Sequence, residues 1–409
     1  MEFQNLIGQL NTLTDDGQRA AFEQLGPQVT GTMAQLGVQN ATSLNMAISR
    51  QVRPGGSNFS AGEAGGDGGN GDGLSGDLAK RGMSREAAAF VASFGRDSDT
   101  FVGRDGDTLV SRNGNGSGWD PPVVRGQQSS DDEFSAWVIG YGMGGVGQSD
   151  GNAAGGNYST GGTLIAIQRR LDDDMLLGMY GAYTSFALST DGPQQSANAT
   201  DGQVGTFFRY EDGLGYSLLS ASVGPDGYNT TRAINIGNIV GNAEADFGGW
   251  QSSIWLERGA TLDYGGWTVQ PLAALSYVFL HQNGYTETGP TIGNLSVDDI
   301  NTNALRGVLG GYVSRSFETS HGSVLRPEAR AFWLHEFLEP ETTVDSSFTA
   351  IGGPSFATQG LNFGRDWGVI GAGLNWSVTQ QLSLFANYDL LVNSRQTSNF
   401  GSGGLQFSW

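Results

Sequence analysis

The sequence has 409 residues, of which 66 are glycine and none is cysteine, and its formal net charge at neutral pH is −20. Glycine is thus more than twice as frequent as the roughly 7% of average proteins. The lack of cysteine excludes disulfide scaffolds, cysteine nucleophiles and thiolate metal sites. The strong negative charge argues against nucleic-acid binding, which requires a clustered basic surface.

The first residues show no targeting segment. Residues 1–6 have neither the basic region nor the apolar region of a secretory signal. Nowhere do about 18 apolar residues follow one another, as a transmembrane helix would require. These features suit a soluble protein, and they suit equally a membrane β-barrel or a chain cut from a longer precursor.

Residues 15–53 are predicted to be helical, because their apolar residues recur at intervals of three and four. Thr14 supplies the N-cap, the pair Gly26 and Pro27 interrupts the pattern, and Pro54 ends it. The segment is either a helical pair packed on a domain surface or a helical linker against or inside something larger. The residues of the apolar stripe are Phe22, Leu25, Val29, Met33, Leu36, Ala41, Leu44, Ile48 and Val52.

The following segment is predicted to be a linker. Glycine, aspartate and asparagine dominate residues 57–76, which cannot bury enough apolar surface to offset the entropy of ordering. A short helix is expected over residues 84–94, with Ser84 as its cap. The sequence therefore predicts three parts, which are a helical part over 1–53, a glycine-rich and aspartate-rich linker over 54–130, and a β domain over 131–409.

From about residue 134 the hydrophobic pattern has a period of two. Tight turns alternate with longer polar loops, expected over 226–244, 282–301 and 340–358. This alternation is typical of an up-and-down antiparallel barrel. Twelve strands are predicted, near residues 134–146, 158–171, 175–188, 198–211, 214–225, 245–263, 266–281, 302–318, 323–339, 361–379, 382–394 and 397–409.

The positions of charges and aromatic residues favour a transmembrane barrel over a soluble one. Both kinds of barrel alternate apolar and polar residues, so periodicity alone does not separate them. Arg326, Glu328 and Arg330 lie in mid-strand, which suits a polar lumen, whereas aromatic residues gather near strand ends as interface girdles do. The fold class predicted is an all-β transmembrane barrel, with an unclear face assignment in the second, third and sixth strands.

A set of charged residues is predicted to face the lumen of this barrel. These residues could pair across the lumen, hold a helix or set an ion preference, and they could equally do no more than stiffen the barrel. They are Arg209, Glu257, Arg306, Arg326, Glu328 and Arg330.

Residues 131–409 resemble the translocator β-domain of autotransporters, the type V secretion proteins of Gram-negative outer membranes. The matching blocks come in the family's order and are WVIGYG at 137–142, LDDDMLLG at 171–178, QPLAALSY at 270–277, YTETG at 285–289 and LRPEARAFWLHE at 325–336. The terminal strand, with Leu405, Phe407 and Trp409 on one face, resembles the signal that the barrel assembly machinery reads.

The resemblance implies a twelve-stranded barrel that anchors an N-terminal passenger and translocates it to the cell surface. The expected partners are outer-membrane lipid, the barrel assembly machinery and the passenger segment itself. In the family a helix commonly occupies the lumen just before the first strand. Here nearly eighty residues separate the stripe of 15–53 from that strand, so either that stripe or the helix over 84–94 lies in the pore, or the helices lie outside the barrel.

Two other functions stay open at this level, a passive outer-membrane channel and a surface adhesin whose loops bind a partner. Enzymatic chemistry is not predicted, and neither is a metal or cofactor. Residues 142–147 match a dinucleotide fingerprint by letters, but no helix is expected after them. His335 and Glu336 lack the second histidine of a zinc protease, and residues 68–73 hold only one copy of a glycine-aspartate repeat.

Overall fold

The computed structural model describes residues 2–56, 134–192, 194–213, 215–289, 292–320, 322–350 and 354–409. Three helices in these residues precede the strands: α1 (Glu2–Thr12), α2 (Asp15–Leu25) and α3 (Gln28–Val52). The domain boundaries expected at residues 53 and 130 stay predictions. The linker expected over 57–76 and the short helix expected over 84–94 lie outside the described residues.

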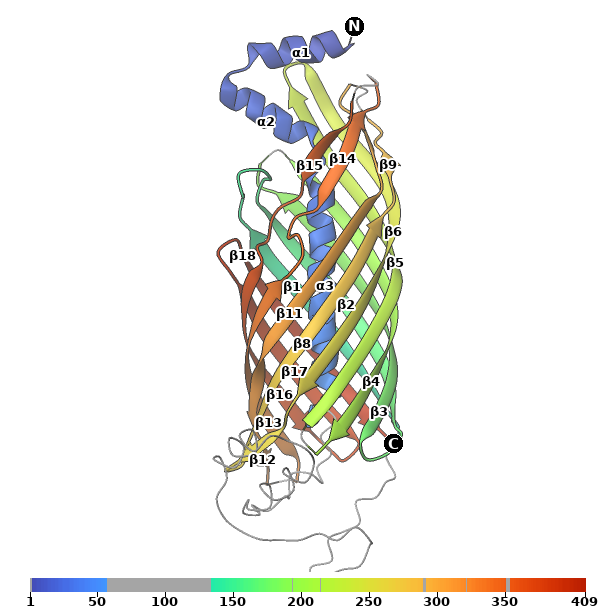
Figure 1. Ribbon diagram of the computed structural model, residues 1–409, viewed down its shortest axis with the longest axis vertical. Helices are drawn as coiled ribbons and strands as arrows, with labels where there is room; N and C mark the ends of the chain where they lie inside the picture. Colours follow the sequence, from blue (N-terminus) through green and yellow to red (C-terminus); the bar gives the residue numbers. More distant parts are fainter. Residues whose placement is uncertain are drawn as a thin grey trace, which may run out of the picture. The chain divides into compact units, whose positions relative to one another are not determined.

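In the described part of the chain, twelve antiparallel strands form a closed barrel (Figure 1). Each strand pairs with the next one along the chain, and the last pairs with the first, with Ser135 opposite Ser408 and Gly147 opposite Gln396. This closure confirms the predicted fold class. The barrel strands are β1 (Phe134–Gly147), β2 (Gly156–Arg170), β3 (Met175–Thr190), β4 (Gln195–Asp212), β5 (Gly215–Ile236), β6 (Ile239–Gly259), β8 (Trp267–Gln282), β11 (Ile300–Arg315), β13 (Val324–Glu336), β16 (Asp366–Ser377), β17 (Leu382–Val392) and β18 (Gln396–Ser408).

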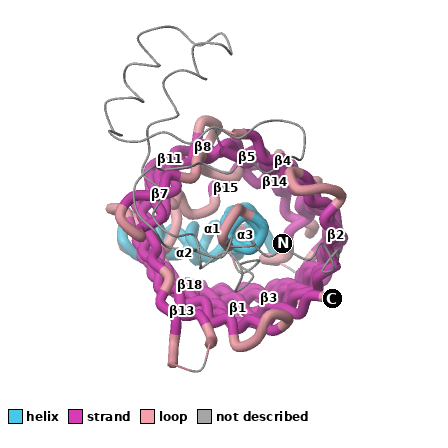
Figure 2. The backbone as a smooth tube through the Cα atoms, turned by 90° about the horizontal axis from the view of Figure 1, so that it is seen from below, coloured by secondary structure: helices cyan, strands magenta, loops and turns pink. Residues whose placement is uncertain are grey.

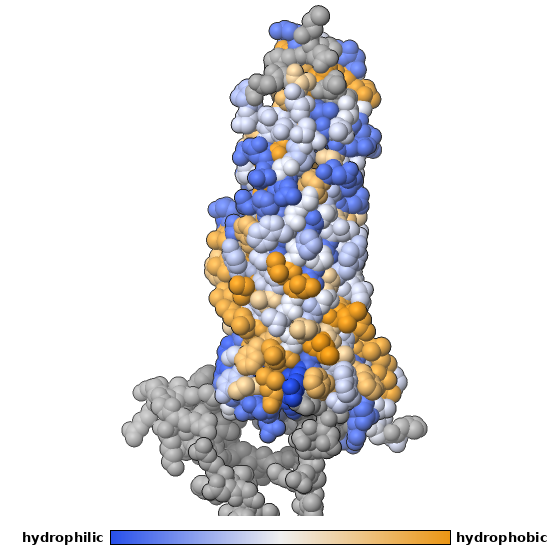
Figure 3. Space-filling view, turned by 90° about the vertical axis from the view of Figure 1, so that its right-hand side faces the viewer, coloured by the Kyte–Doolittle hydropathy of each residue, from blue (hydrophilic) through white to orange (hydrophobic). Residues whose placement is uncertain are grey.

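Alternate residues of each strand face the lumen and the outside, as the pleat of a strand requires. In β8 the side chains of Gln270 and Ser276 are buried, whereas Leu275 is exposed on the outer wall. Figure 3 shows apolar residues gathered on the lower part of one face, below a mostly hydrophilic upper part. Such a belt fits a bilayer. Exposed apolar residues of the wall include Ile165, Met179, Val204, Leu256, Ile370 and Leu374.

The two ends of the barrel differ in their connections. At the end drawn lowest in Figure 1, strands are joined mainly by short turns, such as residues 171–174 between β2 and β3. We call this the short-turn end, and the opposite one the long-loop end. Two short strands, β7 (Leu262–Tyr264) and β12 (Phe317–Glu318), pair with β8 and β13 at the short-turn end.

The prediction of a loop over residues 226–244 is wrong. β5 and β6 continue as a paired hairpin up to Ile236 and Ile239, and the turn between them places Gly237 at a φ of 61°. Only glycine adopts this left-handed conformation without strain. The segment also contains β-branched residues, which favour strands, so its polar residues can belong to a paired hairpin. The hairpin extends beyond the apolar belt, where its outer face can contact water.

The other two expected loops hold short strands. β9 (Tyr285–Thr286), β10 (Leu295–Val297), β14 (Thr343–Phe348) and β15 (Phe356–Gln359) form a second sheet at the long-loop end. The barrel strand expected from residue 361 starts only at Asp366. Its first apolar residues, Leu361 and Phe363, are instead buried in the core that includes α3 residues.

The helices follow the predicted break at Gly26 and Pro27, and the Thr14 hydroxyl accepts a hydrogen bond from the backbone N–H of Gly17, as predicted for the cap. Helix α1 precedes the apolar pattern of residues 15–53, and it packs with α2 against the β5–β6 hairpin through Leu6 and Leu10. Helix α3 lies inside the ring of strands (Figure 2). Among the described residues, no helix is both long and apolar enough to cross a membrane.

Candidate functional site in the helix-filled lumen

Helix α3 is buried along all of its 25 residues, although many of them are polar. A helix with polar residues on every face is stable inside a protein only if its side chains find hydrogen-bond partners. The barrel wall supplies these partners. Gln39 donates to the Ser398 hydroxyl at 3.2 Å, and Asn45 donates to the Ser253 hydroxyl at 3.2 Å.

A group of charged residues surrounds the C-terminal turn of α3. Arg50 pairs with Asp389 of β17 at 2.9 Å, and Asp389 also accepts from Arg330 at 2.5 Å. Arg330 forms a second ion pair with Glu328 at 3.3 Å, and Glu328 also pairs with Arg53, which follows the helix directly. We call Arg50, Arg53, Glu328, Arg330 and Asp389 the lumen charge cluster. Its five members are buried, so each charge depends on its partners in the cluster.

Two further contacts hold the same end of the helix. The guanidinium of Arg53 stacks on the ring of Tyr312, with 3.7 Å between its central carbon and the ring centroid. Arg209 of β4 donates to the backbone carbonyl of Val52. This carbonyl is one of those that a helix leaves without an internal partner, and a cation there also interacts favourably with the helix dipole.

The remaining predicted lumen charges are buried as well, and two of them contact α3. Glu257 accepts a hydrogen bond from the Ser49 hydroxyl at 2.6 Å. Arg306 pairs with Glu336 at 3.0 Å and donates to Thr42 at 3.3 Å. Five of the six predicted charges thus bind the helix or belong to its charge cluster.

Arg326 is the sixth predicted charge, and it donates to the Ser314 hydroxyl at 2.7 Å and 2.9 Å. Arg50, Arg53 and Asp389 were not among the residues predicted to face the lumen. A signal existed for Asp389, because it is the single charged residue of its strand and lies at alternate spacing from Asn387 and Phe385.

At the long-loop end, loop and strand residues close around the start of α3. The Thr30 and Tyr285 hydroxyls lie 2.7 Å apart, and burial raises the pKa of Tyr285, which keeps this phenol protonated. Gln35 donates to the Thr342 hydroxyl at 2.8 Å. A Cβ added to Gly31 would lie 2.8 Å from the Thr342 carbonyl oxygen and 2.9 Å from the backbone nitrogen of Gly360. The contact therefore has no room for a side chain at Gly31.

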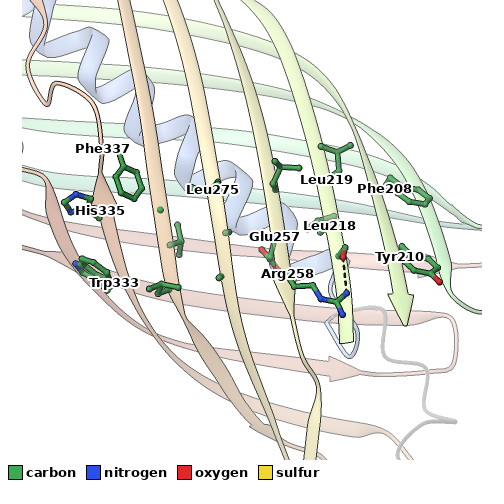
Figure 4. A pocket seen from close by; sticks show the side chains of 17 residues that line it. Phe208, Tyr210, Leu218, Leu219, Glu257, Arg258, Leu275, Trp333, His335 and Phe337 are labelled. Carbon is green, nitrogen blue, oxygen red and sulfur yellow. Dashed lines mark hydrogen bonds between the residues drawn. The ribbon is translucent and has the colours of Figure 1, made fainter. Parts of the chain in front are cut away.

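The outer wall carries an apolar groove that crosses β4, β5, β6, β8, β11 and β13 (Figure 4). Leu219, Leu275 and Trp333 line it, and Arg258 at its edge donates to Ser217 and pairs with Asp212 at 2.8 Å. Its place in the apolar belt makes it a lipid-facing surface rather than a reaction site. In the described residues, no three His, Cys, Asp or Glu side chains converge as metal ligands would.

A polar helix held through the axis of a twelve-stranded barrel narrows the choice of family. The family model described as "Autotransporter beta-domain" matches residues 136–389. The chain belongs to the autotransporter family.

Relatives and solved structures agree with this assignment. The chain is 23% identical over 281 residues to an extracellular serine protease of Serratia marcescens, and 25% identical over 304 residues to outer membrane protein A of Rickettsia rickettsii. These matches cover 67% and 70% of this chain but only 26% and 13% of the relatives, so the chain spans a small part of their length.

The translocator domain of autotransporter NalP from Neisseria meningitidis has a similar fold, with a TM-score of 0.54 at 14% identity over 69% of this chain and 90% of that one. The β domain of the Bordetella autotransporter BrkA aligns with a TM-score of 0.50 at 18% identity, over 68% and 100% of the two chains. This autotransporter barrel resides in the bacterial outer membrane, where it translocates and anchors a covalently linked passenger.

Proposed function

We propose that α3 is the segment that remains in the translocator after transport, with the lumen charge cluster fixing its inner end. Support comes first from its direction. The helix starts at the long-loop end, beside α1 and α2, and ends at the short-turn end (Figure 1). Because short turns of outer-membrane barrels face the periplasm, this direction puts the chain before α3 on the cell surface.

The charges of the lumen provide the second support. Buried ion pairs stabilise little by themselves, but they specify one arrangement when each charge is satisfied. Arg50 and Arg53 are placed at the C-terminal turn of α3, and their acidic partners lie on β13 and β17. A helix shifted by one turn would leave both cations without these partners, so the cluster sets the depth at which α3 stops.

A filled lumen does not favour a passive channel. The described lumen holds a helix whose every residue is buried, and the loops at its mouth pack on Thr30 and Gly31. We therefore propose that the barrel is closed to solutes in this state and that it has no catalytic role of its own.

The outward face of β18 supports a further part of the proposal, recognition by the barrel assembly machinery. Leu405, Phe407 and Trp409 are exposed on the outer wall, and β18 is the strand whose pairing with β1 closes the barrel. An exposed apolar edge strand offers both backbone groups and side chains to a partner before closure.

The experiment is antibody labelling of intact cells that express the chain with an epitope inserted before Glu2. The proposal predicts surface labelling and resistance of residues 28–52 to external protease. A matched sample with an epitope in the turn of residues 378–381 should be labelled only after the outer membrane is opened. Labelling of the second epitope alone on intact cells would show that the barrel and helix have the opposite direction.

A further inference from the structure

The chain passes from α2 to α3 at the long-loop end of the barrel (Figure 1). The last four carbonyls of a helix and its first four N–H groups have no partners within it. Pro27, at the N-cap of α3, supplies no side-chain hydrogen bond. Residues 25–29 are buried, so their backbone groups need partners from the surrounding protein rather than from water.

One side chain of β4 bonds to both helix ends. The Gln195 amide oxygen accepts from the backbone N–H of Val29 at 3.2 Å, at the start of α3. The amide nitrogen donates to the backbone carbonyls of Glu23 at 3.1 Å and Gly26 at 3.0 Å, at the end of α2. Gln195 is 2% exposed, and the Thr190 hydroxyl accepts from its backbone N–H at 3.1 Å. A single, firmly placed amide therefore joins the two helices to the barrel wall.

A buried arginine of β5 holds the same end of α2. Arg232 is 1% exposed and donates to the backbone carbonyl of Gln24 at 2.6 Å. Glu287 orients the guanidinium by accepting from its Nε at 3.1 Å and from one Nη. A cation at the C-terminal end of a helix also interacts favourably with the helix dipole. Gln195 and Arg232 thus bind three backbone carbonyls where α2 ends, and we call these two residues the rim catch.

We propose that the rim catch positions the transported chain where it leaves the barrel and keeps α1 and α2 folded on the β5–β6 hairpin. Both residues donate to backbone carbonyls, so the contact depends on the path of the chain and not on its side chains. The inference rests on the proposed function, in which the chain before α3 lies on the cell surface. There the rim catch protects the segment that joins the passenger to the barrel from external proteases.

Trypsin reports whether α1 and α2 stay folded, because the sequence offers it a single site in them. Arg19 of α2 is exposed and is the only lysine or arginine among residues 1–49, and the next one, Arg50, is buried in the lumen. Cleavage of a folded segment follows the fraction of molecules in which it has opened. An epitope without lysine or arginine, inserted before Glu2, is therefore released into the medium when the helix pair opens.

The experiment compares trypsin release of this epitope from intact cells that express the full chain with Gln195→Glu or Gln168→Glu. A carboxylate at position 195 still accepts from Val29, but it faces the two carbonyls with an oxygen in place of the donating nitrogen. Because two buried hydrogen bonds are lost, release should be at least about tenfold faster.

Gln168→Glu is the matched control. Gln168 is also 2% exposed, and its partners Ser135 and Trp137 lie on β1 near the short-turn end, far along the barrel from the rim catch. The control should release the epitope as slowly as the unmodified chain does. In every chain, release is divided by the amount of folded barrel, which the change in gel mobility on heating measures. If Gln195 only stabilised the barrel, its variant would lower that amount and leave the release per folded barrel unchanged.

Further variants keep the proposal open to refutation if Gln195→Glu fails to fold. Gln195→Met removes all three hydrogen bonds without burying a charge, and Gln168→Met is its control. Arg232→Met combined with Glu287→Gln removes the second contact together with its buried countercharge, so that no unpaired charge is left behind. Each of these Gln195 and Arg232 variants should raise the release per folded barrel.

Two results would count against the account in different ways. Unchanged release from the folded Gln195 or Arg232 variants, with the epitope of the unmodified chain labelled on the cell surface, would overturn the rim catch and leave the proposed function intact. An epitope that antibody does not label on intact cells with the unmodified chain would instead refute the proposed function.

Discussion

Arg50 of helix α3 and Asp389 of strand β17 form an ion pair 2.9 Å long across 339 positions of sequence. The contact joins the segment before the barrel to one of the last strands that close it. Asp389 also accepts from Arg330, so one carboxylate links the helix to two strands. The position of the helix and the integrity of the wall therefore depend on the same buried group.

Asp389→Asn should lower the free energy of unfolding by about 3–5 kcal/mol, because it leaves Arg50 buried without a negative partner. Urea titration of the barrel in lipid vesicles measures this loss. Arg258→Gln is the control, since it breaks an exposed pair with Asp212 and should cost at most about 1 kcal/mol. Equal losses of unfolding free energy in the two variants would show that the buried pair stabilises the barrel no more than the exposed pair does.

Gly31→Val should prevent the long-loop end from closing on α3. A Cβ at this position would overlap the backbone of Thr342 and Gly360, which has no freedom to move as a flexible side chain would. External protease should then cleave near residues 340–360 in the variant and not in the original chain. Gly401→Ala is the control, because its Cβ would meet no atom within 4 Å. Equal protease resistance of both variants would contradict the tight contact at Gly31.

Leu275→Arg should cost roughly 2–4 kcal/mol of folding free energy in bilayers, because it places a charge on the lipid-facing wall. Leu262→Arg, at the short-turn end, should cost about 0–1 kcal/mol because it lies nearer the interface. Urea titration in vesicles compares the two. An unchanged free energy for Leu275→Arg would mean that this face does not contact lipid.

Deletion of residues 407–409 should block insertion of the barrel into the outer membrane. The deletion removes two exposed aromatic residues of the terminal segment and the pairing of Phe407 with Ala136. Insertion is followed by the change in gel mobility that a folded barrel shows on heating. A truncated chain that still shows this change in cells would refute the role of these residues in assembly.

Much of the barrel could be predicted from the sequence, because a wall with lipid on one side and a polar lumen on the other forces a period of two. Leu275 and Ser276 illustrate this constraint. The part of the β5–β6 hairpin beyond the apolar belt was not predicted, because polar residues occur on both of its faces and such a pattern is typical of a loop. The separate helix α1 has no apolar stripe of its own to mark its bounds, because its buried apolar residues Leu6 and Leu10 pack against that hairpin.

The candidate site was predictable on the barrel side only. Glu328 and Arg330 lie in mid-strand, and this position indicates a polar lumen. Their partners Arg50 and Arg53 lie at the end of a helical segment, where cations are common on exposed helices too. No local pattern indicates that this helix lies within the barrel, because its position depends on contacts between residues more than 200 positions apart.

The central claim is that α3 closes the lumen of the translocator, and single-channel conductance in planar bilayers tests it most directly. The intact chain should show a closed pore with rare, small openings. Deletion of residues 15–53 should open the pore to a large and steady conductance, provided that the gel-mobility change on heating shows an intact barrel. A steady open conductance of the intact chain, or a closed pore after the deletion, would contradict the claim.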